Sequence, residues 1–404
     1  MQRHTQLNIL RELQRQLRDG VNIDAGVQYR NPASSYTCPD LARTEWDSFF
    51  RNHPQVIGLS GDLPKPGSFM VADDFGVPVL ATRDRDGAFH AFLNSCRHRG
   101  VRVANEPRGT AGSFMCPFHH WSYANTGDLL NVPRAADFGP IDKSCHGLVR
   151  LPAEEKYGLL IVHPQPDGEL NSAELLGELG PEIDGWNFDS LVYTGETVLR
   201  NDLNWKLAND TFGETYHFGR LHKDTLGKLF HGDALAYQEF GRNHRFVWAN
   251  KKIDALKDLP EEEWDYSQSA GWIYYLFPNI QLTGGASDAN LIKIYPDADN
   301  PGRSITRVHH YFSAEIIATA AAHDTTTKDD VYDPNRTPSI TAVSEIFDST
   351  IEQEDYLMGE TTQKTAEAGL VKEFIFGRNE PALHHYHNTY REALNLPPLE
   401  PVNG

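Results

Sequence analysis

CRHRG at residues 96–100 and CPFHHW at residues 116–121 each bring one cysteine and one histidine close together. The histidine follows its cysteine after one intervening residue in the first string and after two in the second. Seventeen residues separate the first histidine from the second cysteine, so the pattern is C-x-H-x17-C-x2-H. The chain has four cysteines in all. Cysteines that stand beside histidines at short spacings favour a metal centre over a disulfide.

The pattern matches the ligands of a Rieske-type [2Fe–2S] cluster, in which two thiolates hold one iron and two imidazoles hold the other. Two loops that each supply one ligand of each kind produce this arrangement. The predicted cluster ligands are Cys96, His98, Cys116 and His119. Imidazole ligation raises the reduction potential, which suits a centre that accepts electrons from a ferredoxin-like donor.

A zinc site with two cysteines and two histidines is the alternative. Zinc sites usually group cysteines two to four residues apart, whereas Cys96 and Cys116 are 20 apart. We therefore favour the iron–sulfur cluster. Trp121, directly after the second loop, is expected to shield the cluster, although an ordinary core position would explain it as well.

A second group of metal-binding side chains lies in ETYHFGRLH, residues 214–222, with the pattern E-x2-H-x4-H. Two histidines and one carboxylate form the ligand set of non-haem iron(II) oxygenases. Histidines five residues apart point about 140° apart on a regular helix. Both could reach one metal if the turn were distorted near Gly219, which lies between them. Taken alone, an amphipathic helix with two incidental histidines also explains the segment.

The chain around these motifs changes character once. Short β-like runs fill about Pro66 to His163, and Asp86-Gly87 is a hairpin signal. Beyond Pro164 the pattern is mixed, with a helical stretch followed by strand-like segments, among them GWIYYLFPNIQL and RSITRVHHYF. Residues 323–338 are polar and predict a surface loop, and residues 339–369 predict one long helix.

Length and charge limit the possible classes of protein. At 404 residues the chain is expected to form at least two domains. A net charge of −19 argues against nucleic acid or an anionic membrane as the main partner. Ile9, Leu10, Leu13 and Leu17 form one stripe on an N-terminal helix, which predicts a docking helix rather than a signal peptide. We expect a soluble, cytoplasmic protein.

These motifs, in this order, resemble the catalytic α subunits of Rieske non-haem iron (aromatic ring-hydroxylating) oxygenases. The resemblance runs from about Glu45 to Tyr390 and includes EDYLMGETTQ at residues 354–363. It implies an α+β fold in which an all-β Rieske domain is inserted in a larger catalytic domain with an antiparallel sheet and helices. The domains expected are an N-terminal helical part of the catalytic domain (1–49), the Rieske domain (50–165) and the catalytic mononuclear iron domain (166–404).

The third iron ligand in this family is an aspartate in the pattern D-x4-E-x2-Q. Asp355 fits this pattern, so the resemblance implies His217, His222 and Asp355 as the ligands of one mononuclear Fe(II). Glu352 and Glu354 lie close enough in sequence to remain alternatives.

In this family, an acidic residue stands three positions before the first iron histidine. Its side chain connects that histidine to a cluster histidine of the next subunit. Glu214 occupies that place, and His119 of a neighbouring subunit is its implied partner. A surface glutamate is the alternative reading of Glu214. The family more often has aspartate here, and glutamate appears in oxygenases that attack quaternary amines. Two further departures are Asp210, where an asparagine near the iron is common, and His120, where a small residue is usual.

The resemblance implies the terminal oxygenase of a multicomponent system. Electrons would come from NAD(P)H through a flavin reductase or a ferredoxin, and O2 would hydroxylate an aromatic or similar apolar small molecule, as in aromatic hydrocarbon catabolism. A homotrimer is expected, with or without a separate β subunit. The residues proposed for the substrate pocket, chosen for their proximity to ligands in sequence, are Asp210, Thr211, Phe218, Phe347 and Ile351.

Two other functions compete with this reading. Oxidative demethylation or C–N cleavage of a carnitine- or betaine-like quaternary amine is favoured by Glu214, by Asp210 and by possible aromatic partners Trp272 and Tyr275. A pure electron carrier is the alternative of another class. The histidine pair with its carboxylate argues against that alternative, because a carrier needs no second metal site.

Overall fold

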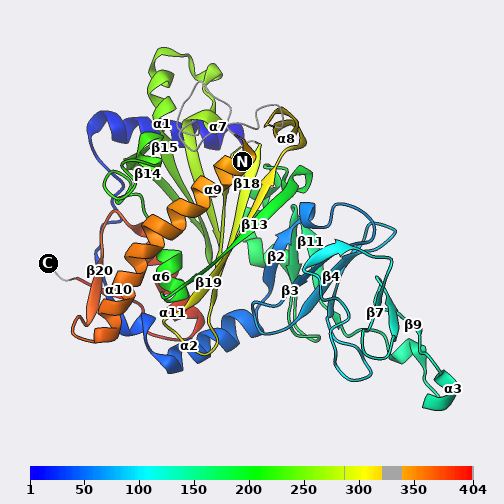
Figure 1. Ribbon diagram of the computed structural model, residues 1–404. Coiled ribbons are helices and arrows are strands. Elements are labelled where there is room, and N and C mark those ends of the chain that lie inside the picture. Colours follow the sequence, from blue (N-terminus) through cyan, green and yellow to red (C-terminus); the bar gives the residue numbers. More distant parts are fainter. Residues whose placement is uncertain (286, 321–338, 403–404) are drawn as a thin grey trace. The chain divides into compact units, whose positions relative to one another are not determined.

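The computed structural model describes residues 1–285, 287–320 and 339–402 (Figure 1). The chain forms two compact units. The larger unit contains Met1–Thr44, Leu176–Trp186 and Tyr193–Gly404, and the smaller contains Glu45–Leu175 and Asn187–Val192. The loop predicted at residues 323–338 lies outside the described residues.

The smaller unit is wider than the predicted range of residues 50–165, because flanking segments pack against its strands. The π-helix η2 (Trp46–Arg51) lies at the start of this unit, mostly before residue 50. The ring of Trp46 lies so close to Gly76 that a Cβ there would be 3.0 Å from Cζ2 of the indole. The η6 turn (Phe188–Ser190) packs equally closely on Gly158. Both segments therefore belong to this unit by packing, which composition does not reveal.

The smaller unit consists of three antiparallel sheets. A five-stranded sheet has the order β10-β5-β4-β3-β6, and two three-stranded sheets have the orders β11-β12-β2 and β7-β8-β9. The strands are β2 (Gln55–Leu59), β3 (Ser68–Ala72), β4 (Val79–Arg83), β5 (Phe89–Leu93), β6 (Arg108–Thr110), β7 (Ser113–Met115), β8 (Ser122–Ala124), β9 (Leu129–Asn131), β10 (Arg150–Leu151), β11 (Ala153–Lys156) and β12 (Leu159–Val162).

The predicted Asp86-Gly87 hairpin joins β4 to β5. Gly87 has a φ of +84°, a conformation that glycine adopts without strain. Asp84 closes the turn by accepting hydrogen bonds from the backbone N–H groups of Asp86 (2.9 Å) and Ala88 (2.8 Å). Side-chain closure of a turn by aspartate is one reason why this residue marks hairpins in a sequence.

The larger unit is built on a seven-stranded sheet with the order β13-β19-β18-β17-β16-β15-β14. Strands β14 to β19 form an antiparallel meander, since each pairs with the next along the chain. The strands are β13 (Val192–Asn201), β14 (Phe230–Phe240), β15 (Asn243–Asn250), β16 (Ala270–Leu276), β17 (Ile280–Gly284), β18 (Asp288–Pro296) and β19 (Ser304–Phe312). The two units together have the predicted α+β character, with antiparallel sheets and helices.

Helices cover this sheet. The apolar strand β16 is buried along nearly its whole length, as expected where both faces are covered. Helices α9 (Ile340–Thr350) and α10 (Tyr356–Ala368) cross one face of the sheet (Figure 1). A small sheet of β20 (Glu373–Phe376), β1 (Tyr29–Pro32) and β21 (Glu400–Pro401) joins segments from both ends of the chain, and helix α11 spans Pro381–Ala393.

The N-terminal helix α1 (Arg3–Asp19) docks on the sheet as its apolar stripe predicts. Ile9, Leu10 and Leu13 are buried, and so is Gln16. The Gln16 amide donates to the carbonyl of Leu235 and accepts from its N–H, both at 2.8 Å, so a buried polar side chain is fully paired with strand β14. Within the described ranges, no helix is both long and apolar enough to cross a membrane.

The long helix predicted at residues 339–369 is present with one irregularity. Ser339 caps its start by accepting a hydrogen bond from Ala342 N at 3.2 Å, and Gly369, with a φ of +67°, ends it. Between α9 and α10 the helix widens into the π-turn η12 (Ile351–Asp355). Such widened turns are often found at functional sites.

Candidate functional site

The first cysteine–histidine loop, residues 96–101, is a closed turn in the smaller unit. Cys96 N donates to the carbonyl of Val101 at 2.8 Å, and Gly100 N donates to the carbonyl of Cys96 at 2.9 Å. These two bonds fix the cysteine at the base of the loop and let the intervening residues project outward. Gly100 has a φ of +76°, which allows the chain to turn back.

The second loop has the same construction. Cys116 N donates to the carbonyl of Trp121 at 2.8 Å, and His120 N donates to the carbonyl of Cys116 at 2.9 Å. His120 therefore occupies the place of Gly100 in the first loop, and it has a φ of +59°. A left-handed conformation suits glycine best, although histidine tolerates it better than most residues. His120 is exposed, so the structure places it in the turn and on the surface.

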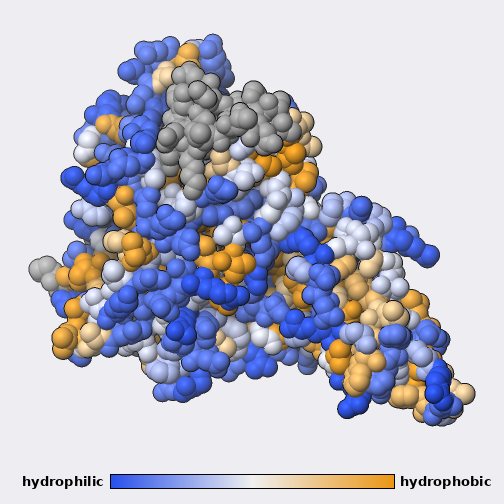
Figure 2. All heavy atoms as spheres, in the orientation of Figure 1, coloured by the Kyte–Doolittle hydropathy of each residue, from blue (hydrophilic) through white to orange (hydrophobic). Residues whose placement is uncertain are grey.

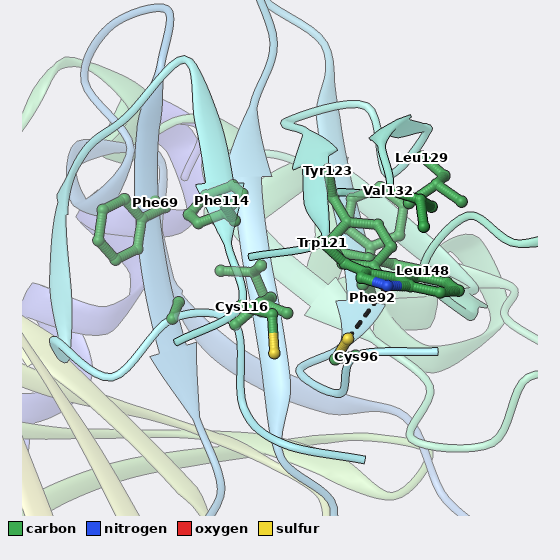
Figure 3. Packing of buried hydrophobic residues seen from close by; sticks show 13 residues of the cluster. Phe69, Phe92, Cys96, Phe114, Cys116, Trp121, Tyr123, Leu129, Val132 and Leu148 are labelled. Carbon is green, nitrogen blue, oxygen red and sulfur yellow. Dashed lines mark hydrogen bonds between the residues drawn. The ribbon is translucent and has the colours of Figure 1, made fainter. Parts of the chain in front are cut away.

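The two loops bring the four predicted cluster ligands together. The sulfur atoms of Cys96 and Cys116 lie at the same end of the buried apolar cluster drawn in Figure 3. The ring centroids of His98 and His119 are 4.6 Å apart. The indole of Trp121 stacks on His98 with centroids 5.3 Å apart and planes 12° apart, so it shields this side of the site as predicted.

Hydrogen-bond donors surround both sulfur atoms. The hydroxyl of Tyr123 lies 3.2 Å from Sγ of Cys96. The backbone N–H groups of Phe118 and His119 point at Sγ of Cys116. Burial raises the pKa of the Cys116 thiol, whereas these N–H groups lower it. Donors aimed at buried sulfur suit thiolates that are bound to a metal, so these residues fit an iron–sulfur cluster.

A second cluster of ligands lies in the larger unit. One side-chain atom each from His217, His222 and Asp355 lies within 4.8 Å of the other two. Oδ1 of Asp355 is 3.4 Å from Nε2 of His217 and 3.0 Å from Nε2 of His222. Nε2 of His222 is buried and makes no hydrogen bond in the described structure despite this proximity. Three donor atoms that converge without satisfying one another fit a bound cation.

The two histidines meet because the chain is not a regular helix there. Helix α6 (Trp205–Asp210) ends before them, and the chain continues in consecutive tight turns. The imidazole centroids are 4.8 Å apart. The sequence predicted a distorted turn between the two histidines, where Gly219 lies, and the chain is indeed irregular there. Gly219 itself has an ordinary φ and open space around it. Gly227 has the constrained position, since a Cβ there would lie 2.8 Å from the carbonyl oxygen of His222.

Each imidazole is held from behind by a carboxylate. Nδ1 of His222 donates to Oε2 of Glu354 at 2.7 Å, and Nδ1 of His217 makes a short hydrogen bond to Glu214. Histidines that bind metals usually donate their second ring N–H in this way, which fixes the tautomer and leaves Nε2 free for the metal. Glu354, considered above as an alternative ligand, therefore lies behind His222 rather than beside Asp355.

The charge around the site favours a cation. Burial lowers the pKa of His217, but the carboxylates of Asp355 and Glu214 outweigh it and raise the pKa to about 10. Burial by itself would raise the pKa of Asp355. Hydrogen bonds and charge interactions with the two histidines outweigh burial and lower this pKa below its ordinary value. A positive charge is thus stabilised among these side chains even without a metal. Two neutral imidazoles and one carboxylate are the donor set of mononuclear non-haem iron(II).

The other two residues of the D-x4-E-x2-Q pattern connect the segments that carry the ligands. Oε1 of Glu360 accepts from Asn201 Nδ2 and from Asp202 N, both at 3.2 Å. Oε1 of Gln363 accepts from Asn204 N at 3.1 Å, and Asn204 caps helix α6. Helix α10 is thereby fastened to the start of the segment that leads to the two histidines.

The metal site opens into a cavity of about 330 Å³. Four of the five residues proposed for a substrate pocket line it, namely Thr211, Phe218, Phe347 and Ile351. The fifth, Asp210, does not line it, and this prediction is corrected. The Asp210 carboxylate accepts from the Tyr36 hydroxyl at 2.7 Å and contacts Nε2 of His387 at 2.9 Å.

The aromatic partners proposed for a quaternary amine also lie elsewhere. Trp272 stacks on Trp186 with ring centroids 4.5 Å apart, and Tyr275 stacks on His244 at 4.9 Å. Neither lines the cavity. Trp272 faces the side of the sheet opposite to Gly271 and Ile273, which line the cavity. Tyr275 shares their face but lies farther along the strand, where its hydroxyl donates to the carbonyl of Pro278 at 2.8 Å.

Several lining residues escaped the sequence analysis. They are Phe230, Trp248 and Asp288, which come from three different strands. Trp248 and Asp288 lie far from every proposed ligand in sequence, and Phe230 lies eight residues after His222. An aspartate that begins a strand after glycines is typical of a turn, so its place in a cavity becomes visible only when the strands are paired.

Glu354 gives a test of the metal site. The change Glu354→Gln keeps the size of the side chain but removes the charge opposite Nδ1 of His222, so we expect the affinity for Fe(II) to fall about 10–100-fold. Equilibrium dialysis of metal-free protein against Fe(II) measures this. Glu352→Gln is the matched control, because Glu352 is exposed in the same π-turn. Equal affinities of the two variants would contradict the role of Glu354.

Two family models match the chain. Residues 53–148 match the Rieske [2Fe-2S] domain, and residues 188–396 match the ring hydroxylating alpha subunit (catalytic domain). The first range contains both cysteine–histidine loops, and the second contains His217, His222 and Asp355.

Two curated relatives illustrate the range of the match. The large subunit of anthranilate 1,2-dioxygenase from Burkholderia cepacia is 34% identical over 219 residues, which cover 50% of this chain and 48% of that protein. The oxygenase subunit of glycine betaine monooxygenase from Chromohalobacter salexigens is 27% identical over 237 residues, which cover 56% and 52%. The chain thus spans about half the length of the curated relatives it matches.

Solved structures share the fold over nearly the whole chain. A quaternary ammonium Rieske monooxygenase superposes with a TM-score of 0.74 at 17% identity, covering 92% of this chain and 96% of that one. Naphthalene 1,2-dioxygenase from Rhodococcus sp. gives 0.68 at 19% identity, covering 96% and 98%. The cofactors of the family are a [2Fe–2S] cluster and a mononuclear iron, and the two donor sets described above fit them. With both domains matched, the chain belongs to the family of Rieske ring-hydroxylating alpha subunits.

Proposed function

We propose that this protein is the terminal oxygenase of a multicomponent system that hydroxylates an aromatic or similar apolar small molecule with O2. The observation that carries the proposal is the convergence of His217, His222 and Asp355 at one wall of a cavity with apolar lining. A pure electron carrier needs neither a three-ligand site nor a cavity beside it, so this arrangement argues against that alternative.

The bound iron would supply the activation of O2, and the protein supplies position and environment. His217, His222 and Asp355 are the proposed ligands, and Glu214 and Glu354 orient the imidazoles. Phenylalanines, leucines and isoleucines of the cavity exclude bulk water and hold an apolar body against the metal site. Three protein ligands leave the remaining coordination positions open toward that cavity.

Electrons would enter at Cys96, His98, Cys116 and His119 from a ferredoxin or flavin reductase that draws on NAD(P)H. His119 is exposed, and exposed Phe118 lies 3.9 Å from it between ring centroids. Other exposed apolar side chains in this region are Met115, Leu130 and Phe138. Figure 2 shows apolar surface around strands β7 and β9, and β7 leads directly into the second cysteine–histidine loop. Apolar surface there suits transient docking of a partner protein.

A homotrimer, with or without a β subunit, would let the cluster of one subunit serve the iron of the next. Glu214 is the proposed bridge to His119 of the neighbouring subunit. Its side chain is 16% exposed, and its carboxylate accepts a short hydrogen bond from Nδ1 of His217.

Oxygen consumption tests the proposal. Purified protein with a surrogate reductase, ferredoxin and NADH should consume O2 when an aromatic acid or hydrocarbon of the right class is added, and it should form a hydroxylated product. The protein should contain about three irons per chain, two in the cluster and one at the mononuclear site. About two irons per chain and no substrate-dependent O2 uptake would indicate an electron carrier.

Oxidative demethylation or C–N cleavage of a quaternary amine remains the second candidate. Glu214 favours it, because the family more often has aspartate at this place and glutamate appears in the oxygenases that attack quaternary amines. The same assay distinguishes the two functions if carnitine- and betaine-like compounds are screened beside aromatic acids. Demethylation releases formaldehyde and C–N cleavage releases a tertiary amine, whereas hydroxylation of a ring releases neither.

The change Glu214→Gln tests the electron route. It keeps the size of the side chain but removes the charge that accepts from the imidazole of His217, and it weakens any bond to His119 of the next subunit. Loss of such a supporting bond alone costs about 10–100-fold. We expect a larger loss of turnover here, because the route itself is interrupted. Single-turnover experiments with pre-reduced protein should show slow cluster reoxidation in the presence of substrate and O2.

Two further measurements make this prediction specific. Both metal centres should still assemble in Glu214→Gln, and the cluster should still accept electrons from an external donor. Glu214→Asp should recover part of the rate, because it restores the charge. Reoxidation at the wild-type rate in Glu214→Gln would mean that Glu214 is a surface glutamate and that electrons cross by another path.

A further inference from the structure

Asp288 is the first residue of strand β18, and its side chain lines the same cavity as the metal ligand Asp355. Within the described part of the chain, its carboxylate has no hydrogen bond and no ion pair. Burial raises the pKa of the Asp288 carboxyl to about 6, and no neighbouring cation counteracts this rise. An ionised carboxylate in this position is costly unless a positive charge approaches it.

The end of the β17–β18 hairpin is shaped to admit this carboxylate. Gly285 N donates to the carbonyl of Asp288 at 3.2 Å and closes the backbone there. A Cβ on Gly285 would lie 2.9 Å from Oδ1 of Asp288, so a larger residue would displace the carboxylate. Gly284 also lines the cavity beside it. The glycines therefore leave the carboxylate in the cavity without giving it a partner.

The rest of the cavity lining offers positive charge only at the histidines of the metal site. Its residues include no lysine and no arginine among those the structure describes. Its titratable residues besides Asp288 are Glu214, His217, His222 and Asp355, which form the metal site. No residue of the described lining pairs with Asp288, so a cation that enters with a ligand of the cavity meets an unpaired carboxylate there.

Aromatic rings line the same cavity as this carboxylate. Phe218, Phe230 and Trp248 contact one another with centroid separations of 5.7–6.3 Å. A Cβ on Gly271 would lie 2.4 Å from the indole of Trp248, so that glycine makes room for the ring. The faces of such rings attract cations, and the attraction is stronger where water is excluded.

We propose that Asp288 binds a positively charged nitrogen of the substrate, so that the cavity selects small molecules that join an apolar or aromatic body to an ammonium group. Asp288 is thus a specificity-determining residue, and the aromatic rings contact the apolar body and the ammonium substituents. The inference rests on the proposed function, because it names the substrate class of that same cavity. It does not depend on which bond of the substrate is oxidised.

Binding without turnover tests the inference. Iron-loaded protein, kept oxidised and without reductase, is titrated by calorimetry with benzyltrimethylammonium, with protonated N,N-dimethylbenzylamine, with neutral benzyl alcohol and with anionic benzoate. We expect both cations to bind at least about tenfold more tightly than benzyl alcohol, a difference of about 1.4 kcal/mol. Benzoate should bind most weakly, because Asp288 repels it.

The change Asp288→Asn keeps the shape of the side chain and should remove the preference for cations while leaving the affinity for benzyl alcohol within about twofold. Asp233→Asn is the matched control, because Asp233 is exposed, lies outside the cavity and loses the same charge. Its preference should equal that of the wild type. At pH 7.5 Asp288→Asn should melt at the same temperature as the wild type or higher, because an unpaired buried charge has been removed.

Three results would overturn the inference. They are equal binding of cationic and neutral probes by the wild type, an unchanged cation preference in Asp288→Asn, and no binding of any cation. A lower melting temperature of Asp288→Asn would show that Asp288 is a structural residue. These outcomes are independent of the proposed function: absence of O2 uptake with every substrate would refute the oxygenase and leave the binding preference standing, whereas hydroxylation of neutral aromatics alone would refute the role of Asp288.

Discussion

Replacing Asp355 with alanine is expected to remove the mononuclear iron and abolish oxygenation while the [2Fe–2S] cluster remains. Among the residues that the structure describes, its carboxylate is the one anionic group whose oxygen lies against Nε2 of both histidines, at 3.4 Å from His217 and 3.0 Å from His222. Without the carboxylate, only two neutral imidazoles remain as ligands, and the site binds a divalent cation much more weakly. Iron analysis should find about two irons per chain instead of three, and substrate-dependent O2 uptake should be undetectable.

Two neighbouring acids on the same turn serve as controls for Asp355→Ala. Glu352→Ala should keep all the iron, because Glu352 is exposed. Glu354→Ala should bind iron more weakly but retain some activity, because Glu354 supports His222 through Nδ1. The visible spectrum of the cluster should be unchanged in all three variants. Retention of activity in Asp355→Ala together with its loss in Glu354→Ala would move the ligand by one residue.

The cluster loops could be recognised from sequence because each one is local. A cysteine, a histidine and the turn between them lie within six residues, and the closing hydrogen bonds from Cys96 to Val101 and from Cys116 to Trp121 stay within that span. The spacing of the cysteine and histidine in the sequence therefore nearly determines how their side chains are arranged in each loop. His120 was noticed only as an unusual residue, and its left-handed φ, matched by that of Gly100, gives the reason why small residues suit the position.

The mononuclear site was only partly accessible in the same way. His217 and His222 are neighbours in sequence, but Asp355 reaches them from a helix more than 130 residues away, and only the family pattern pointed to it. The π-turn that ends at Asp355 was not predicted, since the sequence read as one regular helix through residues 339–369. A single widened turn leaves the hydrophobic period of such a helix almost unchanged.

The cavity was the least predictable part, because its walls depend on strand pairing and on which face of the sheet each side chain takes. Phe218 and Ile351 were chosen for their proximity to ligands and do line it. Asp210 was chosen for the same reason but is engaged by Tyr36 and His387. Asp288 lies far from every ligand in sequence. Its position follows from the register of β17 against β18, in which Gly284 pairs with Ala289.

The change Cys96→Ser is expected to eliminate the cluster and with it every reductase-dependent activity. The sulfur is buried in the apolar cluster of the smaller unit, and a serine hydroxyl in its place is a poor ligand for iron of this cluster. The wild type should be red-brown and give an electron paramagnetic signal when reduced, and the variant should lose both. Cys116→Ser should behave alike, whereas Cys145→Ser should keep the colour, because Cys145 is exposed and outside both loops.

The matched variant Tyr123→Phe separates loss of the cluster from a change in its potential. Arg97 N donates to the Tyr123 hydroxyl at 3.0 Å, so the hydroxyl proton is free to point at Sγ of Cys96, 3.2 Å away. Hydrogen bonds to the sulfurs tune the reduction potential of such clusters. Tyr123→Phe should therefore keep the colour and the iron but lower the potential, because the thiolate loses a donor that stabilised the reduced, more negative cluster. Unchanged colour in Cys96→Ser, or a colourless wild type with one zinc per chain, would contradict the iron–sulfur assignment.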